Sequence, residues 1–171
     1  MSENKAPYGR GMMMLFWVAL LAVAYLFFAD FEANKRNPNR DISTAYHENY
    51  KEVVLRSARY GHYVADGKIN QQAVTFMVDT GASFVSVPES IANRLGLRKG
   101  PKLQTQTAAG RVTVYGTVLE SVSIGDITVR DVQATINPHN NSDELLLGMS
   151  FLKHLEMLHK DGELRLRQPS F

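Results

Sequence analysis

The chain has 171 residues, of which 21% are charged, and its formal net charge at pH 7 is +2. This length accommodates one domain of ordinary size and a short additional segment. The small net charge does not favour a nucleic-acid partner, and the absence of cysteine excludes disulfides, thiolate nucleophiles and cysteine-based metal sites.

An apolar helix is the first predicted element, after a short N-terminal tail over residues 1–11. The 19 residues between Arg10 and Asp30 carry no charge. As a helix they would be about 28 Å long, close to the thickness of the hydrocarbon core of a bilayer. A cleaved signal peptide is the alternative, but its apolar core is normally shorter, and no suitable small-x-small cleavage site follows this run. We therefore predict a transmembrane anchor over residues 12–29, in contact with the lipid bilayer.

A polar segment over residues 30–50 follows the anchor. It contains Asn37-Pro38-Asn39 and shows little periodicity, so we expect a linker that leads to a domain over residues 51–171. Two basic residues precede the anchor and three follow it, so the positive-inside rule leaves the membrane orientation open.

Short strands separated by tight turns fill the predicted domain. Alternating apolar residues over 74–78 are typical of a half-buried strand. Residue pairs that favour two-residue hairpin turns stand at 66–67, 125–126 and 161–162. This pattern predicts an all-β fold, specifically a small closed barrel.

One or two short helices are expected within this β region. Ser86 and Glu89 have the spacing of a capping box, Pro88 suits a first helical turn, and Gly96 would end the helix in the left-handed conformation. The second helix would follow Gly148.

The most informative motif is Asp79-Thr80-Gly81, which directly follows the apolar strand over 74–78. A carboxylate at the end of a buried strand, turned by Thr-Gly, is how an aspartic peptidase presents its catalytic Asp. A strand that ends in an ordinary Asp-x-Gly turn is the alternative. An apolar strand after the turn, and a later apolar run that ends in Gly148, favour the catalytic interpretation.

Taken together, these segments resemble the retropepsin-like aspartic proteases, and within them a bacterial, membrane-anchored, single-domain branch. The resemblance covers about residues 51–171, with the motifs in the order of that family: Gly61-His62-Tyr63, residues 76–83, Leu95-Gly96-Leu97, residues 107–110 and residues 146–152. It implies a retropepsin-like acid-protease barrel that hydrolyses protein or peptide substrates without a cofactor. It also implies a single-pass protein of the inner (cytoplasmic) membrane with its catalytic domain in the periplasm.

The resemblance further implies roles for individual residues. Asp79 would be catalytic, and the hydroxyl of Thr80 would bond across a dimer and brace the two loops. Gly81 can bring its backbone N–H close to the carboxylate. Ser83 is either a supporting donor or an ordinary small turn residue. Gly148 would let the preceding strand lie against the catalytic turn without a side-chain clash.

The segment Thr107-Ala108-Ala109-Gly110 would form the substrate-binding flap. Relatives usually carry Asn where this chain has Ala109. Asn tolerates positive φ and Ala does not, so we expect a different turn type at the tip of this flap.

Peptide hydrolysis of this kind needs two carboxylates that share one proton. The chain has one Asp-Thr-Gly, and its β region is too short for two lobes, so we expect the second Asp79 to come from another copy in a homodimer. Asp126 and Asp161 also adjoin glycines, but hairpin chemistry explains both. The histidines show no spacing typical of a metal site, so no metal is predicted.

A non-catalytic dimerising or peptide-binding module on the same barrel is the alternative function, and the intact Asp79-Thr80-Gly81 motif favours the enzyme.

Overall fold

The computed structural model describes residues 8–107 and 110–169. It divides into two compact units, residues 1–36 and residues 37–171.

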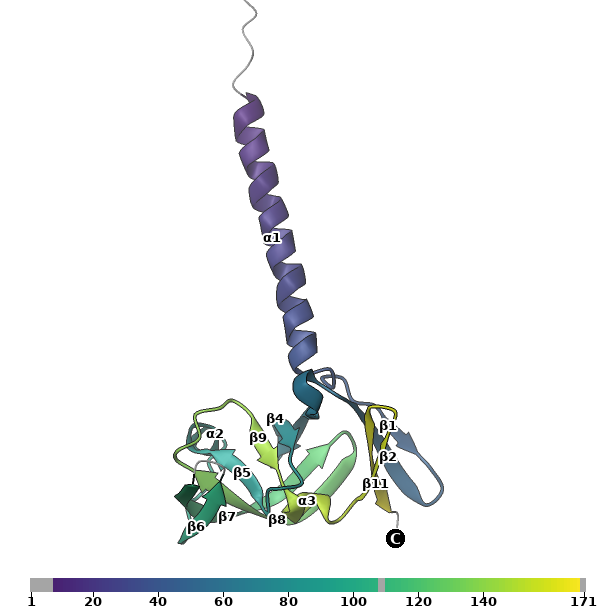
Figure 1. Cartoon of the computed structure of the whole chain (residues 1–171), viewed down its shortest axis with the longest axis vertical. Coiled ribbons are helices and arrows are strands. Elements are labelled where there is room, and N and C mark those ends of the chain that lie inside the picture. Colours follow the sequence, from purple (N-terminus) through teal and green to yellow (C-terminus); the bar gives the residue numbers. More distant parts are fainter. Residues whose placement is uncertain (1–7, 108–109, 170–171) are drawn as a thin grey trace, which may run out of the picture. The chain divides into compact units, whose positions relative to one another are not determined.

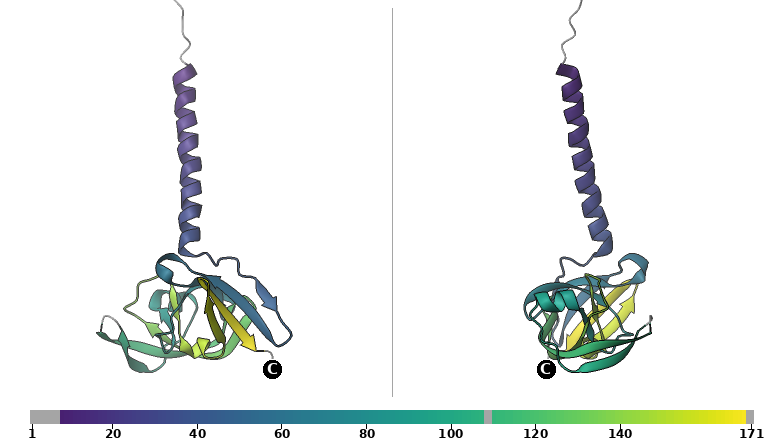
Figure 2. Two further views of the ribbon diagram at one scale, coloured as in Figure 1. Left: turned by 45° about the vertical axis from the view of Figure 1, so that its right-hand side comes forward. Right: turned by 90° about the vertical axis from the view of Figure 1, so that its left-hand side faces the viewer.

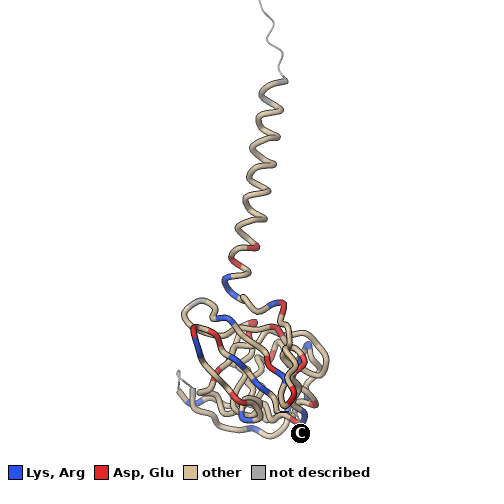
Figure 3. Tube along the Cα trace, turned by 90° about the vertical axis from the view of Figure 1, so that its right-hand side faces the viewer, with Lys and Arg blue, Asp and Glu red and all other residues tan. Residues whose placement is uncertain are grey.

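The first unit contains one long helix, α1 (Tyr8–Arg36), drawn in purple to blue in Figure 1. An 18-residue window of its segment Gly11–Arg36 has a mean hydropathy of 2.4 and no buried residues, so the helix is long and apolar enough to cross a membrane. Figure 3 shows the uncharged stretch of this helix and the charged residues near its C-terminal end. The segment predicted as an anchor lies within α1, and the helix continues beyond it to Arg36.

The segment expected as a linker over residues 30–50 is more ordered than the sequence suggests. Its first part completes α1, and Asn37 and Asn39 are buried in the second unit. The Nδ2 group of Asn39 donates to the carbonyl oxygens of Arg56 at 2.9 Å and Val64 at 2.7 Å. Its Oδ1 atom accepts from the N–H of Arg56 at 2.7 Å. These bonds fix the chain where the second unit begins, because they satisfy backbone groups of two different strands.

The second unit contains a small antiparallel sheet with the order β1-β2-β11-β10. Its strands are β1 (Thr44–Tyr46), β2 (Tyr50–Arg56), β10 (Glu156–Lys160) and β11 (Glu163–Pro169). Within the described residues, β10 pairs only with β11 and therefore forms one edge of this sheet.

A larger sheet has the order β3-β4-β9-β5-β8-β7-β6, and an additional pairing of β3 with β7 closes it into a barrel. Its strands are β3 (Val64–Ile69), β4 (Gln72–Val78), β5 (Val85–Pro88), β6 (Lys102–Thr107), β7 (Gly110–Ile124), β8 (Ile127–Asn137) and β9 (Leu145–Leu147). The hairpin of β6 and β7 projects from this barrel (Figure 2). The closed, mostly β architecture predicted from the sequence is confirmed.

The core of the barrel consists of aliphatic side chains and two phenylalanines. Phe76 of β4 and Phe151 are fully buried. They pack with the inward-facing residues of the strands, such as Leu119, Ile136 and Leu147. This alternation of buried and exposed positions is the reason why the sequence pattern predicted strands.

Two short helices complete the unit, α2 (Glu89–Arg94) and α3 (Met149–Leu152). Gly96 has φ +69°, and the N–H of Leu97 reaches the carbonyl oxygen of Ala92 at 2.9 Å, so α2 ends in the left-handed conformation as predicted. The predicted capping box is wrong, because no side chain caps this helix and Ser86 belongs to β5 instead.

The hairpin turn predicted at residues 66–67 is also wrong. Strand β3 runs through Asp66-Gly67, and the turn lies at Asn70-Gln71, where both residues have positive φ. A Cβ atom on Gly67 would lie 2.3 Å from the carbonyl oxygen of Ser123, so glycine serves a close approach of strands at this position. The hairpins predicted at 125–126 and 161–162 are confirmed.

Candidate active site

Asp79 lies at the point where β4 leaves the sheet. Its backbone N–H donates to the carbonyl oxygen of Leu147 at 3.1 Å, and its own carbonyl oxygen accepts from the N–H of Ala82 at 3.2 Å. The N–H of Gly81 donates to the Asp79 carboxylate at 2.9 Å. This bond orients the side chain. The half-buried carboxylate therefore projects from a tight, internally bonded turn.

Strand β9 lies between β4 and β5 in the sheet (Figure 1). It runs parallel to β4, with Val78 opposite Leu147, and antiparallel to β5, with Ser86 opposite Leu146. Residues 79–84 must therefore cross over the end of β9 to join the two outer strands. Because β4 and β5 both pair with β9, the two ends of this loop are fixed to the same strand.

The segment after β9 bonds to the loop through its backbone. The N–H of Met149 donates to the carbonyl oxygen of Ala82 at 2.8 Å, and the N–H of Ser150 donates to that of Ser83 at 2.9 Å. Gly148 is buried beneath these contacts. A Cβ atom on it would lie 2.3 Å from the carbonyl oxygen of Phe84. Any larger residue would push the loop away from β9.

Ser150 is a residue of this site that the sequence analysis did not identify. Its side chain is buried, and its Oγ atom accepts a hydrogen bond from the N–H of Val85 at 3.0 Å. The bond joins the start of α3 to the end of the Asp79 loop. Ser150 is the single hydroxyl residue within the apolar segment 145–152. This pattern could have identified it, because a buried polar group needs a hydrogen-bond partner.

A groove of about 670 Å³ extends from Asp79 to the β6–β7 hairpin. Asp79, residues 81–84 and Ser86 supply one wall, and Gln104, Thr105 and Gln106 of β6 supply the opposite wall. The remaining lining residues come from the barrel and a nearby loop: Val114, Thr135, Asn137, Asn140 and Leu146. Such a volume is within the range typical of ligand sites. Asp79 supplies the single carboxylate among the described residues that line it.

The other predicted site residues are distributed around this groove. Gly81 and Ser83 line it, whereas the exposed side chain of Thr80 makes no hydrogen bond to the described residues. Thr107 pairs with Gly110, so these two close the hairpin of β6 and β7, and Gly110 has φ +112°. Ala108 and Ala109 lie outside the described residues.

Asp126 and Asp161 lie in hairpins that connect strands. Asp126 accepts a hydrogen bond from the hydroxyl of Tyr46 at 2.6 Å, and Asp161 has φ +55° in the turn between β10 and β11. Neither lines the groove. Among the described residues, no group of three or more His, Cys, Asp or Glu side chains is placed to hold a metal ion.

Comparison with known proteins decides the family. The sequence model described as "gag-polyprotein putative aspartyl protease" matches residues 65–154, which include the Asp79 loop, the β6–β7 hairpin and the β9–α3 segment. The chain belongs to this aspartyl protease family. Its solved fold relatives include a retropepsin-like aspartic protease from Rickettsia conorii, with a TM-score of 0.58 at 24% identity over 76% of this chain and 97% of that one. The predicted retropepsin-like fold is therefore confirmed.

Two bacterial proteins are similar to this aspartyl protease homologue in sequence. An uncharacterized protein from the cobV 5′ region of a Sinorhizobium species is 32% identical over 179 residues, which cover 96% of this chain and 77% of that protein. An uncharacterized protein of Rickettsia prowazekii is 29% identical over 116 residues, or 66% of this chain and 49% of that one. The first similarity extends beyond the barrel, because it covers nearly the whole chain.

Proposed function

We propose that this chain is an aspartic endopeptidase that is tethered to a membrane and active as a homodimer. The observation that carries the proposal is the Asp79 carboxylate, held by the N–H of Gly81 at 2.9 Å in a groove that contains no second carboxylate among its described lining residues. With Asp79 from each of two copies, one carboxylate takes a proton from water as the water attacks the scissile carbonyl carbon. The other carboxyl group protonates the carbonyl oxygen, and the pair shares one proton because two adjacent charges repel each other.

The edge strand β10 supports the pairing of two copies. All five of its residues are exposed, and an exposed strand edge carries unpaired backbone N–H and C=O groups. Antiparallel pairing of β10 with the same strand of a second copy, centred on Leu158, would place Glu156 opposite Lys160 in both directions. Such opposite-charge pairs stabilise adjacent strands, and the arrangement has the two-fold symmetry that most homodimers use.

Helix α1 supports tethering. Its apolar segment Gly11–Arg36 is long enough to cross a bilayer. Confinement of the copies to one surface raises their effective concentration and favours pairing without any new contact. We propose that this surface is the inner (cytoplasmic) membrane and that the catalytic domain, with its substrate, lies in the periplasm. We propose that the chain consists of a tail over residues 1–11, an anchor over residues 12–29, a linker over residues 30–50 and a protease domain over residues 51–171.

The remaining site residues support Asp79 in this proposal. Thr80, exposed beside Asp79, would brace the partner loop, and Ser83 would line the substrate path. Thr107 and Gly110 close the β6–β7 hairpin, and the flap of residues 107–110 would cover the bound peptide.

The deciding experiment uses the full-length protein in detergent micelles, with a peptide library as substrate. We expect Asp79→Asn to remove cleavage, because loss of the acid–base pair costs several powers of ten in rate. An excess of Asp79→Asn protein should also inhibit the wild type, because mixed dimers lack one carboxylate. Asp161→Asn is the matched control, since it removes a carboxylate from another Asp-Gly pair and Asn tolerates its positive φ. Cleavage by Asp79→Asn at the wild-type rate would contradict the proposal and leave a peptide-binding module as the alternative.

A further inference from the structure

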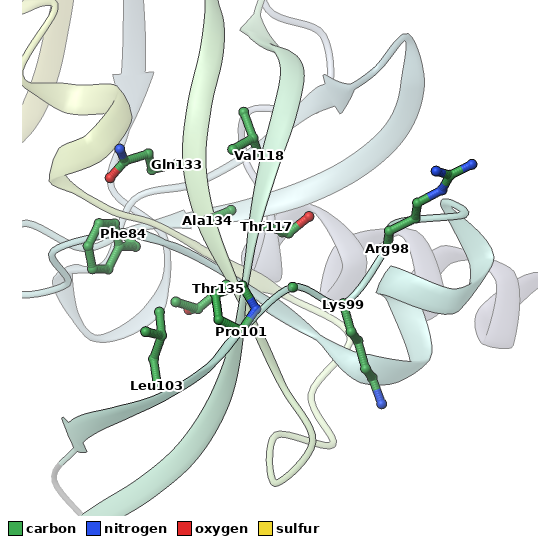
Figure 4. Close-up of a pocket in the computed structure, with 12 residues that line it drawn as sticks. Phe84, Arg98, Lys99, Pro101, Leu103, Thr117, Val118, Gln133, Ala134 and Thr135 are labelled. Atoms are coloured by element: carbon green, nitrogen blue, oxygen red, sulfur yellow. The ribbon is translucent and has the colours of Figure 1, made fainter.

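A hollow of about 310 Å³ lies between the Asp79 loop, β8 and the segment that begins with α3. Ser83 and Phe84 line it from the loop, so it adjoins the Asp79 groove, but Asp79 is not among its described lining residues. Figure 4 shows Phe84 and Gln133, which line this hollow and also the larger one drawn there. The hollow is therefore a separate space beside the loop, with walls of its own.

Three basic side chains line this hollow. Arg130 comes from β8, and Lys153 and His154 follow α3. All three are exposed, and no described residue forms an ion pair or a side-chain hydrogen bond with them. Asp131 is the one carboxylate among the described lining residues, and it has no ion-pair partner among them either. Two permanent cations and one carboxylate leave the hollow positive even when His154 is neutral.

Ser150 supplies a buried hydrogen-bond donor to the same hollow. The residue is 8% exposed, and its Oγ atom accepts from the N–H of Val85 at 3.0 Å. A hydroxyl group can also donate one hydrogen bond, and no described residue accepts from Ser150. Since buried polar groups are nearly always paired, this O–H is available to a group that occupies the hollow.

The backbone of β8 is distorted where it borders the hollow. Asp131 has φ +53°, which is unusual for a residue other than glycine inside a strand. The ladder pairs of β7 and β8 continue on both sides of Asp131 but omit it. Adjacent residues of a regular strand face opposite sides, whereas Arg130 and Asp131 both line this hollow. The left-handed residue allows this arrangement, and backbone strain of this kind is concentrated at functional sites.

We propose that this hollow is a binding site for a phosphate group. Such a group carries about −1.5 to −2 charges at pH 7 and several acceptor oxygens, and guanidinium, ammonium and hydroxyl groups are its usual partners. Arg130, Lys153 and Ser150 together offer more N–H and O–H donors than one carboxylate can accept, so phosphate satisfies the site better than a carboxylate does. Bound phosphate would connect β8 with the segment after α3, whose Ser150 holds the end of the Asp79 loop.

The test titrates full-length protein in detergent micelles with inorganic phosphate, while sodium chloride keeps the ionic strength constant because exposed charges are screened by salt. Phosphate should raise the midpoint of thermal unfolding of the wild type, since a ligand that binds the folded state stabilises it. Phosphorus NMR line broadening gives the affinity. Lys153→Gln and Arg130→Gln should each weaken binding roughly tenfold, the loss expected for one charge-assisted hydrogen bond. Lys68→Gln, at an exposed position of β3 outside the hollow, is the matched control and should bind phosphate as the wild type does.

Asp131→Asn distinguishes an anion site from a site for a cation. Asn tolerates positive φ, so the backbone is retained while the carboxylate is removed. Phosphate should then bind roughly three- to fivefold more tightly, because a like charge no longer opposes it. Weaker binding by Asp131→Asn, or equal binding by the wild type and Lys153→Gln, would overturn the proposal. A midpoint that phosphate raises no more than chloride does would overturn it as well.

The same phosphate group is available as a soluble ion and in the headgroup of a lipid. Micelles that contain phosphatidylglycerol separate the two sources. If this lipid competes with inorganic phosphate on the wild type but not on Lys153→Gln, the site takes a headgroup. An unchanged affinity for inorganic phosphate identifies the soluble ion as the ligand. All of these measurements report binding, so their outcome does not depend on whether the protein cleaves peptides.

Discussion

Gly148 lies so close to the Asp79 loop that a Cβ atom on its α-carbon would be 2.6 Å from the carbonyl oxygen of Ala82. The same atom would be 2.3 Å from the carbonyl oxygen of Phe84. Both oxygens belong to the backbone, so neither can rotate away as a flexible side chain would. The carbonyl group of Ala82 is also fixed by the N–H of Met149 at 2.8 Å. The loop that carries Asp79 can therefore keep its geometry only if residue 148 is glycine.

Gly148→Ala should therefore lower both stability and cleavage. We expect the free energy of unfolding to fall by about 1–3 kcal/mol, the usual cost of forcing an extra methyl group into a packed site. Cleavage should fall further than stability explains, because the displaced loop carries the Asp79 carboxylate. Gly11→Ala in α1 is the control, since a Cβ atom there meets no atom within 4 Å. Thermal unfolding and peptide cleavage by the full chain provide the measurements, and equal behaviour of the two variants would contradict this argument.

Ser150→Ala tests the second contact that holds the loop. It removes the acceptor of the Val85 N–H and leaves this buried donor without its 3.0 Å bond. A buried donor without a partner costs about 1–3 kcal/mol. We expect a corresponding loss in the free energy of unfolding, measured by denaturant titration. Ser90→Ala on the exposed face of α2 should be nearly neutral, and a Ser150→Ala protein as stable as that control would show that Val85 finds another acceptor.

The sequence predicted features that depend on local chemistry and missed those that depend on distant contacts. The hairpins at 125–126 and 161–162 form because Gly125, Asp161 and Gly162 adopt positive φ without help from the rest of the chain. The same residue types at Asp66-Gly67 form no turn. Asp66 instead accepts bonds from Asn37 at 2.7 Å and Thr75 at 2.8 Å, and such partners cannot be identified from turn propensity.

In the candidate site, too, the sequence predicted the residues that local motifs mark and missed those that depend on distant contacts. Asp79 and Gly148 belong to short motifs that a strand–turn pattern identifies. The part of the groove that β8 supplies was not predicted, since the approach of Asn137 to Asp79 depends on closure of the barrel. The order of residues 37–39 was missed for a similar reason, because the partners of Asn39 lie on β2 and β3.

Glu52 links stability to pH. Its side chain is 7% exposed and accepts hydrogen bonds from Arg167 at 2.6 Å and Arg165 at 3.2 Å. The bond from Arg167 lowers the pKa of Glu52 below its ordinary value of 4.5, and the charge of Arg165 acts in the same direction. A carboxylate with a lowered pKa in the folded state adds stability that is complete above about pH 4.5 and is lost as the pH falls through the lower folded-state pKa.

Glu52→Gln should accordingly destabilise the full chain by about 1–2 kcal/mol at neutral pH, a moderate value because both arginines are partly exposed and screened by solvent. The difference from wild type should shrink as the pH falls below about 4.5. Denaturant titrations at a series of pH values measure this, with Glu120→Gln at an exposed position of β7 as the control. A difference that stays constant down to pH 2.5 would show that the carboxylate charge of Glu52 contributes nothing.

The charge pattern of β10 allows a direct test of the proposed pairing. With Leu158 opposite its own copy, Lys160→Glu places two glutamates opposite each other on both sides of the two-fold axis. Glu156→Lys likewise places two lysines opposite each other. Each variant alone should associate roughly five- to tenfold more weakly than the wild type, because two favourable cross-strand pairs become repulsive. An equimolar mixture restores both opposite-charge pairs in the mixed dimer.

Association is measured by analytical ultracentrifugation of the full chain in detergent, and cleavage is measured in the same samples. The mixture of Lys160→Glu and Glu156→Lys should recover most of the association and of the activity that either variant alone has lost. High salt should weaken the difference, since these charges are exposed and screened. Within one chain, Lys160 and Glu156 also face Glu163 and Arg167 of β11, so each variant loses one local pair as well. Recovery in the mixture separates the two effects, because a partner chain cannot restore a pair lost within its neighbour. Weak association that persists in the mixture would place the contact between copies elsewhere than β10.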